Sequence, residues 1–225
     1  MEILSLSDMN ILDISFLIKN EYFKNLKEID LSNNKIAYIN ILLNAVCTKL
    51  EILNLSDNEI KDINILEKVP FNNLKVLNLS HNEINDITIL KNCSFFKLYE
   101  LNLSENKIIN VDILSETKFY NLFELNLSFN KIQNIAFLKD APFEEIEYVS
   151  FRGNKIRDIN VFNNVTIYYL QEIDLSENEI NNIDVLNNEL VFGEIKYIDL
   201  RDNDIDIENQ NNKLIIKKFG NKIEI

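Results

Sequence analysis

Apolar and polar residues recur along the chain with a period of 24 residues. The segment from Leu50 to Leu66 reads Leu-Glu-Ile-Leu-Asn-Leu-Ser-Asp-Asn-Glu-Ile-Lys-Asp-Ile-Asn-Ile-Leu, and the segment from Leu74 to Leu90 repeats its apolar positions one for one. The alternation around Asn54 is typical of a short strand with Leu53 and Leu55 turned inward and Asn54 turned to solvent. Because nine copies are recognisable, we predict nine strands stacked in parallel.

An asparagine follows each predicted strand. The first copy has Met9 at this position, and the later copies have Asn34, Asn58, Asn82, Asn106, Asn130, Asn154, Asn178 and Asn203. With only three glycines in the chain, the turns must satisfy their backbone groups in another way, and a buried amide offers both donors and an acceptor. We therefore predict that this asparagine ladder is structural and bonds the backbone of neighbouring coils.

Four rows of apolar residues fill the rest of the period. The first three rows, which we expect to face the core, are Ile36, Ile60, Ile84, Ile108, Ile132, Ile156 and Ile180; Ile39, Ile63, Ile87, Val111, Ile135, Ile159 and Ile183; and Leu42, Leu66, Leu90, Leu114, Leu138, Phe162 and Leu186. The fourth row is Phe23, Cys47, Phe71, Phe95, Phe119, Phe143, Ile167 and Phe192. We expect this bulky row on the convex side, at a short helix or 3₁₀ turn that wedges the coils apart. A lone coil cannot bury these faces, so stability must come from its neighbours.

The two ends of the array differ from its middle. Met1 leads almost directly into the first strand, so the segment from Ile3 to Ser7 is an open sheet edge through which we expect self-association. After residues 209–212 break the pattern, the segment from Leu214 to Phe219 predicts a helical turn with Leu214 and Ile216 in register with the core. Residues 222–225 then predict a tenth strand, with a hairpin around Gly220 as the alternative. The predicted organisation is nine repeats over residues 1–208 and a partial repeat or cap over 209–225.

The repeated pattern L-x-x-L-x-L-x-x-N-x-I-x-x-I-x-x-L resembles the leucine-rich-repeat family. Its I-x-x-I-x-x-L part is most similar to the phosphatase-regulator and internalin-type subclass, and the resemblance covers about 200 of the 225 residues. It implies an α/β fold: a right-handed horseshoe solenoid with a parallel β-sheet on the concave face and short helices or 3₁₀ turns on the convex face. It also implies a scaffold or regulatory module that binds proteins.

Charge and composition narrow the class of partner and the compartment. The chain has 23 basic and 36 acidic residues, a net charge of −13, which argues against nucleic acid and favours a protein with a basic surface. The sequence has neither an apolar run of 18 residues nor a signal-peptide pattern at its start, so we expect no membrane insertion. Cys47 and Cys93 lie two coils apart, too far for a disulfide, and a reducing compartment, the cytoplasm or the nucleus, is expected. Four Asn-Leu-Ser sequons on the predicted sheet face also argue against a eukaryotic secretory route.

The residues that catalysis needs are scarce. The single histidine, His81, has no nucleophile beside it in the pattern, and one histidine with two distant cysteines cannot assemble a metal site. The segment from Asp202 to Asp206 resembles the start of a calcium loop, but Ile207 and Lys213 stand where that loop requires glycine and glutamate. We therefore expect no enzyme activity, no cofactor and no metal.

The candidate binding surface is the concave face, which the pattern predicts to be acidic and rich in amides. A few apolar, aromatic or basic residues depart from this background, and such residues dominate binding energy in interfaces. Phe129 is the clearest, and with Tyr148 and Arg152 it should form a compact anchor. The candidate partner-binding residues are Phe129, Tyr148, Arg152, Phe123, His81, Val76, Asn102, Asn126, Glu124, Tyr197 and Arg201. The alternative is a surface or secreted adhesin, or the recognition domain of an effector, of the internalin type.

Overall fold

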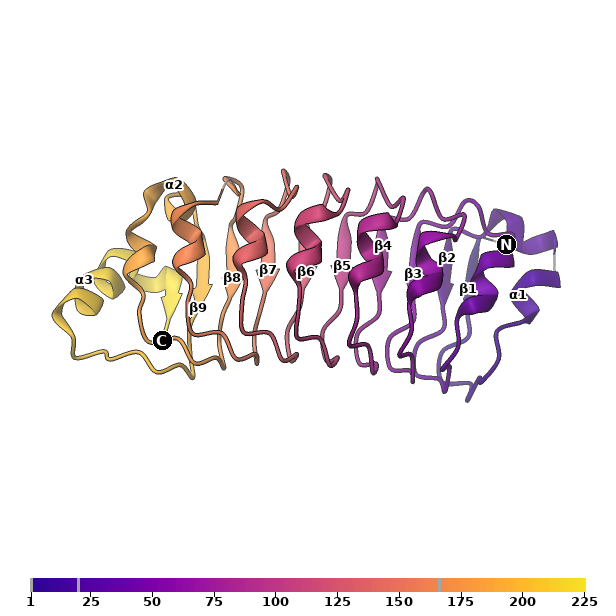
Figure 1. Cartoon of the computed structure of the whole chain (residues 1–225), viewed down its shortest axis with the longest axis horizontal. Coiled ribbons are helices and arrows are strands. Elements are labelled where there is room, and N and C mark those ends of the chain that lie inside the picture. The colour runs from indigo at the N-terminus through magenta and orange to yellow at the C-terminus, as the bar shows by residue number, and fades with distance from the viewer. Residues whose placement is uncertain (1, 20, 166) are drawn as a thin grey trace.

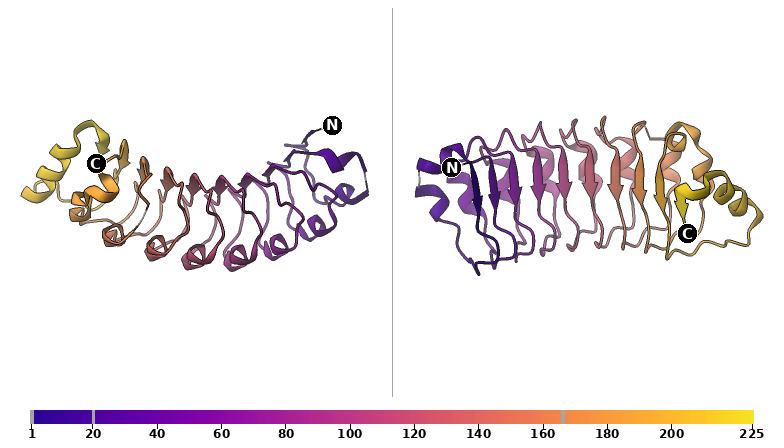
Figure 2. Two further views of the ribbon diagram at one scale, coloured as in Figure 1. Left: turned by 90° about the horizontal axis from the view of Figure 1, so that it is seen from above. Right: turned by 180° about the vertical axis from the view of Figure 1, so that it is seen from behind.

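The chain folds into a curved solenoid in which each coil places one strand on the inner face and a short helix on the outer face (Figure 1; Figure 2). The computed structural model describes residues 2–19, 21–165 and 167–225. In this part of the chain ten strands form one parallel sheet in sequence order. The strands are β1 (Ile3–Ser5), β2 (Glu28–Asp30), β3 (Ile52–Asn54), β4 (Val76–Asn78), β5 (Glu100–Asn102), β6 (Glu124–Asn126), β7 (Tyr148–Ser150), β8 (Glu172–Asp174), β9 (Tyr197–Asp199) and β10 (Ile223–Glu224).

Short helices cover the outer side of the arc, which gives the horseshoe its curvature because a helix is wider than a strand (Figure 2). The α-helices are α1 (Phe16–Lys19), α2 (Glu189–Phe192) and α3 (Gln210–Phe219). The 3₁₀ helices are η1 (Glu21–Asn25), η2 (Asn40–Asn44), η3 (Asn64–Glu67), η4 (Thr88–Asn92), η5 (Asp112–Glu116), η6 (Ala136–Lys139), η7 (Asn160–Asn163), η8 (Asp184–Asn187) and η9 (Gly220–Lys222). The predicted α/β solenoid, with its parallel concave sheet, is therefore confirmed.

The core follows the predicted rows. Leu53 and Leu55 are fully buried and Asn54 between them is half-buried, so the strand alternation is as predicted. All four apolar rows are buried. One placement was wrong: in most coils the convex 3₁₀ helix carries the third row, for example Leu66 in η3, whereas Phe71 follows that helix on the way back to the strand. In these coils the phenylalanines are buried in the segment between the helical turn and the next strand.

The asparagine ladder bonds neighbouring coils as predicted. Asn58 donates from Nδ2 to the carbonyl oxygens of Leu31 (3.0 Å), Leu55 (3.1 Å) and Ser56 (3.0 Å), and its Oδ1 accepts the N–H of Ile36 (2.9 Å). Equivalent bonds recur from Asn34 to Asn203. Each amide thereby satisfies the backbone of two coils at a turn that has no regular secondary structure.

At the C-terminal end β10 pairs in parallel with β9, whereas a hairpin around Gly220 would have produced an antiparallel pair. Helix α3 ends at Gly220, which has a φ of 58°. The predicted register of this helix was wrong for Leu214, which is 66% exposed; Ile215 and Phe219 are the buried apolar residues. The helix begins at Gln210, earlier than predicted, and packs on the core through Asn212, Ile215 and Phe219, so Leu214 lies on its solvent-facing side.

Candidate partner-binding surface

The outward positions of the strands form the concave floor, and part of it has a structural role. Asn102, at the end of β5, accepts the backbone N–H (3.0 Å) and the hydroxyl (2.7 Å) of Ser104 at Oδ1. Asn126 makes the same pair of bonds with Ser128. Such bonds from an asparagine to the residue two positions later stabilise the turn that ends the strand. The oxygen atoms of these two predicted binding residues are therefore already engaged in the free protein.

The residue before each ladder position, which Met9 occupies in the first coil, adopts the left-handed backbone conformation. These residues are Asp8, Asn33, Asp57, His81, Glu105, Phe129, Gly153, Glu177 and Asp202. Glycine, aspartate, asparagine and histidine tolerate this region comparatively well, but a bulky residue there is a genuine outlier. Phe129, with a φ of 52°, thus occupies a position that costs roughly 1 to 2 kcal/mol of backbone strain.

The Phe129 ring lies over the next coil, and we call Phe129, Arg152, Gly153 and Glu177 the Phe129 cluster. A Cβ atom placed on Gly153 would come within 2.7 Å of Cε1 of Phe129, so the ring occupies the space that a side chain would fill. The guanidinium carbon of Arg152 is 5.3 Å from the ring centroid, within cation–π range. Nε and Nη2 of Arg152 donate to Oε1 of Glu177 at 3.0 and 2.6 Å. The ring is thus held in place yet remains 41% exposed.

Tyr148 and Glu124 lie opposite each other at the start of β7 and β6. Both are half-buried. Burial raises the pKa of Tyr148, and nearby acidic residues, including Glu124, raise it further. Burial and then the charge of Glu100 raise the pKa of Glu124. Tyr148 therefore presents a protonated hydroxyl on an acidic floor, one strand along from Glu124.

Phe123 lies just before β6 and stacks on Tyr99, with ring centroids 4.7 Å apart and planes 8° apart. The spacing matches the distance between neighbouring strands of a sheet. Tyr99 was not among the predicted binding residues, although it stands 24 residues before Phe123 and so occupies the same row of the repeat. Comparing that row along the chain would have found the pair.

Val76 and His81 lie at the two ends of the fourth coil's strand segment. Val76 begins β4 and is half-buried, next to Glu100 on β5. His81 is exposed and bonds Asp57 through Nδ1, while its Nε2 is 3.9 Å from a carboxylate oxygen of Glu105. The bond to Asp57 raises the pKa of His81, and burial opposes that shift. The imidazole thus bridges two acidic residues of the left-handed row.

Tyr197 and Arg201 belong to the coil of β9, at the C-terminal end of the sheet. Burial and the charge of Asp199 raise the pKa of Tyr197 to about 12. Arg201 bonds the buried carboxylate of Asp199 and approaches Glu224 at 3.1 Å. Burial raises the pKa of Asp199, but the bonds from Arg201 outweigh it and keep this pKa below its usual value. Arg201 therefore neutralises a buried charge, and the structure does not bring this pair to the Phe129 cluster.

The described residues include no group of three histidine, cysteine, aspartate or glutamate side chains that could hold a metal ion. Cys47 and Cys93 are buried free thiols, and burial raises their pKa values to about 11 and about 12. A thiol reacts as a thiolate, so neither cysteine is an activated nucleophile. Within the same residues, each helix is too short or too polar to cross a bilayer.

Comparisons with known proteins point to one repeat family. The sequence profile described as "Leucine Rich repeats (2 copies)" matches residues 24–68 and 48–92. Internalin C2 from Listeria monocytogenes is similar in structure, with 25% sequence identity, a TM-score of 0.73, and coverage of 88% of this chain and 80% of that chain. A leucine-rich-repeat protein from Leptospira interrogans has 21% identity and a TM-score of 0.70, covering 90% of this chain and 55% of that chain. No curated protein matched the sequence.

A plant receptor extends the range of similar folds. The plant peptide hormone receptor RGFR1, solved in complex with RGF2, has 20% identity and a TM-score of 0.62, covering 81% of this chain and 29% of that chain. At this identity the likeness concerns the fold alone. Horseshoe solenoids of this kind use their extended concave surface for binding.

Proposed function

Since the chain belongs to the leucine-rich-repeat family, we propose that it is a non-catalytic module that binds a partner protein through its concave face, in a scaffold or regulatory role. The family's fold is in general a protein-interaction module. The observation that carries the proposal for this chain is the Phe129 cluster. An exposed ring is held in a strained backbone position by a glycine and an arginine of the next coil.

The backbone at position 129 does not require an aromatic residue. Asp, Asn or Glu at position 129 would fit the left-handed backbone as well or better, as they do in other coils. Backbone strain at functional sites persists where the surrounding structure holds it. A ring pre-positioned by Arg152 and Gly153 loses little conformational entropy on binding, so it suits an interface anchor.

Charge supports a basic partner. The net charge is −13, and the concave floor carries Glu100 on β5, Glu124 on β6, and Glu172 and Asp174 on β8. A positively charged surface would be attracted at long range and would find the anchor faster. We also propose the cytoplasm or nucleus as the compartment, because Cys47 and Cys93 are free thiols and a reducing compartment keeps thiols in this form.

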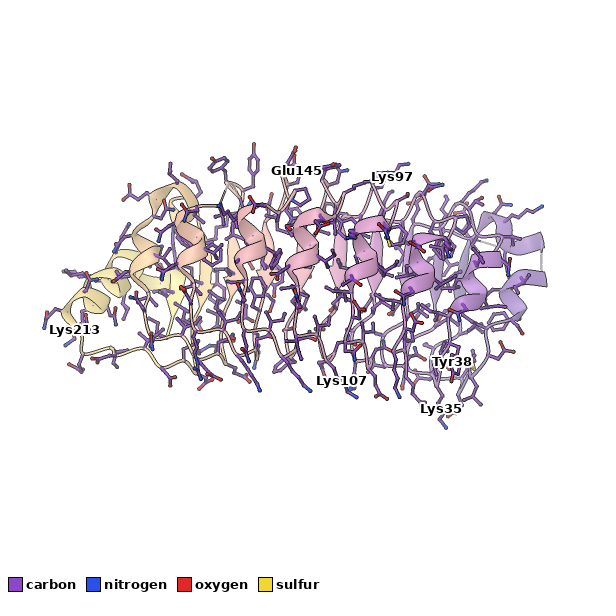
Figure 3. All side chains as sticks on the ribbon, in the orientation of Figure 1. Lys35, Tyr38, Lys97, Lys107, Glu145 and Lys213 are labelled. Carbon is purple, nitrogen blue, oxygen red and sulfur yellow. The ribbon has the colours of Figure 1, made fainter. Side chains whose placement is uncertain are left out.

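The test compares binding by the wild type with binding by Phe129→Ala and Tyr148→Ala variants. Partners are captured from the native cell extract, purified, and titrated by isothermal calorimetry. Truncation of an interface anchor costs about 2 kcal/mol, so each variant should bind about 30-fold more weakly. The control is Tyr38→Ala, which removes an aromatic side chain that is 79% exposed and lies on another edge of the solenoid (Figure 3). Equal affinity for all four proteins would refute the concave anchor.

A second function is favoured by the similarity to internalin C2 at 25% identity. We propose as the alternative that the chain is the recognition domain of a surface or secreted adhesin or effector of the internalin type. The two proposals share the concave anchor and differ in compartment. Fractionation of the native cells with an antibody against the chain distinguishes them, because the protein would be found at the cell surface or in the medium only in the second case.

A further inference from the structure

An exposed aromatic surface lies beside the concave floor, at the edge where the strands begin. It consists of Phe96, Tyr99, Tyr120 and Phe123, which come from two neighbouring coils, and we call it the aromatic rim. Phe96 and Tyr120 are each 47% exposed and Tyr99 is 42% exposed. Lys97, which lies between Phe96 and Tyr99 in the sequence, and Glu145, in the coil after Phe123, are labelled along this edge in Figure 3. Adjacent exposed aromatic residues of this kind are typical of interaction sites rather than of an inert surface.

The aromatic rim interrupts a row of polar contacts between neighbouring coils. In the row of residues that precedes the strands, Lys27 pairs with Glu2 at 3.1 Å and Lys75 pairs with Glu51 at 2.7 Å. Further along the same row, Gln171 bonds Glu147. Between these pairs the row holds the stacked rings of Tyr99 and Phe123. In these two coils an apolar contact that is open to solvent stands where the other coils have polar contacts.

The next row presents two carboxylates of like charge. Glu100 and Glu124 are direct partners on β5 and β6, so their backbones are about 4.8 Å apart. Within the described residues neither side chain has a hydrogen-bond or ion-pair partner. Like charges on opposed strand positions destabilise a sheet. A cation placed between them would relieve that repulsion.

We propose that the aromatic rim, with Glu100 and Glu124, docks a segment of the partner protein that carries an arginine. The methylene stem of the arginine packs across the edges of Tyr99 and Phe123, while its guanidinium donates to both carboxylates. Arginine fits better than lysine because its planar fork can donate to two acceptors at once and its stem buries apolar surface. Phe96 and Tyr120 receive apolar side chains that flank the arginine. This inference rests on the proposed function and names the chemistry that the concave face recognises.

The test uses short acetylated peptides in which one central residue, flanked by leucines, is arginine, lysine or citrulline. Each peptide is titrated into the full chain labelled with ¹⁵N, and the amide shifts of Tyr99, Glu100, Phe123 and Glu124 report binding. We expect saturable shifts with the arginine peptide, with a Kd several-fold lower than that of the lysine peptide and about tenfold lower than that of the citrulline peptide. Citrulline keeps the shape of arginine without its charge. Equal binding of the arginine and citrulline peptides would overturn the proposal.

Two substitutions localise the effect. Glu124→Gln keeps the size of the side chain and Phe123→Leu keeps its apolar character, and each should weaken the arginine peptide about fivefold. Glu59→Gln is the matched control, because it removes the same charge at the edge of the solenoid where Tyr38 lies, away from the rim (Figure 3), and it should leave the Kd unchanged. Peptide binding that Glu124→Gln and Phe123→Leu leave intact would also overturn the proposal. Because the probe is a peptide rather than the native partner, this result is independent of the Phe129→Ala titration that tests the proposed function.

Discussion

Substitution of Gly153 by alanine tests whether the Phe129 ring is held in place by the neighbouring coil. The added Cβ would lie 2.7 Å from Cε1 and 3.2 Å from Cγ of Phe129, so the ring must move. The Gly153 backbone has a φ of +65°, which an alanine adopts only with strain. The substitution therefore has two separable effects, one on the backbone and one on the ring.

Both effects can be given a magnitude. Left-handed backbone strain costs an alanine about 1 kcal/mol relative to glycine. Displacement of the ring from Arg152 loses a cation–π contact worth about 0.5 to 1 kcal/mol at an exposed site. We expect Gly153→Ala to lower the free energy of unfolding by about 2 kcal/mol. In a Phe129→Ala background the ring contribution is gone, and the same substitution should cost about 1 kcal/mol.

The assay is a double-mutant cycle by urea unfolding, followed by far-ultraviolet circular dichroism. The four proteins are the wild type, Phe129→Ala, Gly153→Ala and the double variant. A coupling free energy of about 1 kcal/mol supports the packing of Phe129 on Gly153. If Gly153→Ala lowers the free energy of unfolding equally in both backgrounds, the position of the Phe129 ring does not depend on Gly153. That result would refute the packing of Phe129 on Gly153.

Three further predictions concern the ladder, the buried acid and the histidine. Asn106→Ala removes bonds to three carbonyl groups and one N–H and should cost at least about 3 kcal/mol in urea unfolding; a cost below that of the exposed Asn110→Ala would contradict the ladder's role. Arg201→Met leaves the Asp199 carboxylate buried without its cation and should cost about 3 kcal/mol at neutral pH. Without Arg201, burial raises the pKa of Asp199, so this carboxylate takes up its proton at a higher pH in the variant than in the wild type. The cost should therefore shrink as the pH falls and Asp199 becomes protonated, and a cost independent of pH would count against it. Because the folded pKa of His81 is raised, its contribution is complete below the unfolded pKa of about 6.5 and is lost as the pH rises through the folded value. Proton NMR titration should give a pKa above 6.5 that falls in high salt, whereas a value at or below 6.5 would refute the bridge; with the ring exposed, the effect on stability should stay below about 1 kcal/mol.

The repeat was predictable because the same sequence pattern recurs in nine copies. Each coil repeats the Leu-x-Leu alternation and the ladder asparagine, so an error in one copy is corrected by the others. The bonds of Asn58 to the carbonyl groups of Leu31 and Leu55 follow from the need to satisfy a turn that is poor in glycine. The C-terminal helix occurs once, and there a start at Gln210 was enough to put Leu214 on the wrong face.

The candidate site was predictable only in part, because its geometry depends on contacts between coils. The sequence singled out Phe129 as an aromatic residue in a polar row and placed Arg152 one coil away. It did not predict the left-handed backbone, although the Asp, Asn, His and Gly in that row favour this conformation. Arg201 was also predicted to bind a partner. The structure shows instead that its guanidinium pairs with the buried carboxylate of Asp199.

The most direct test of the central claim is hydroxyl-radical footprinting of the chain, alone and bound to its captured partner, with oxidation measured at each aromatic residue by mass spectrometry. Phe129 and Tyr148 lie on the concave face, whereas Tyr38 is exposed on another edge of the solenoid and reports the rest of the surface. We predict that binding protects Phe129 and Tyr148 and leaves Tyr38 unchanged. Protection of Tyr38 together with unchanged oxidation of Phe129 and Tyr148 would contradict binding through the concave face.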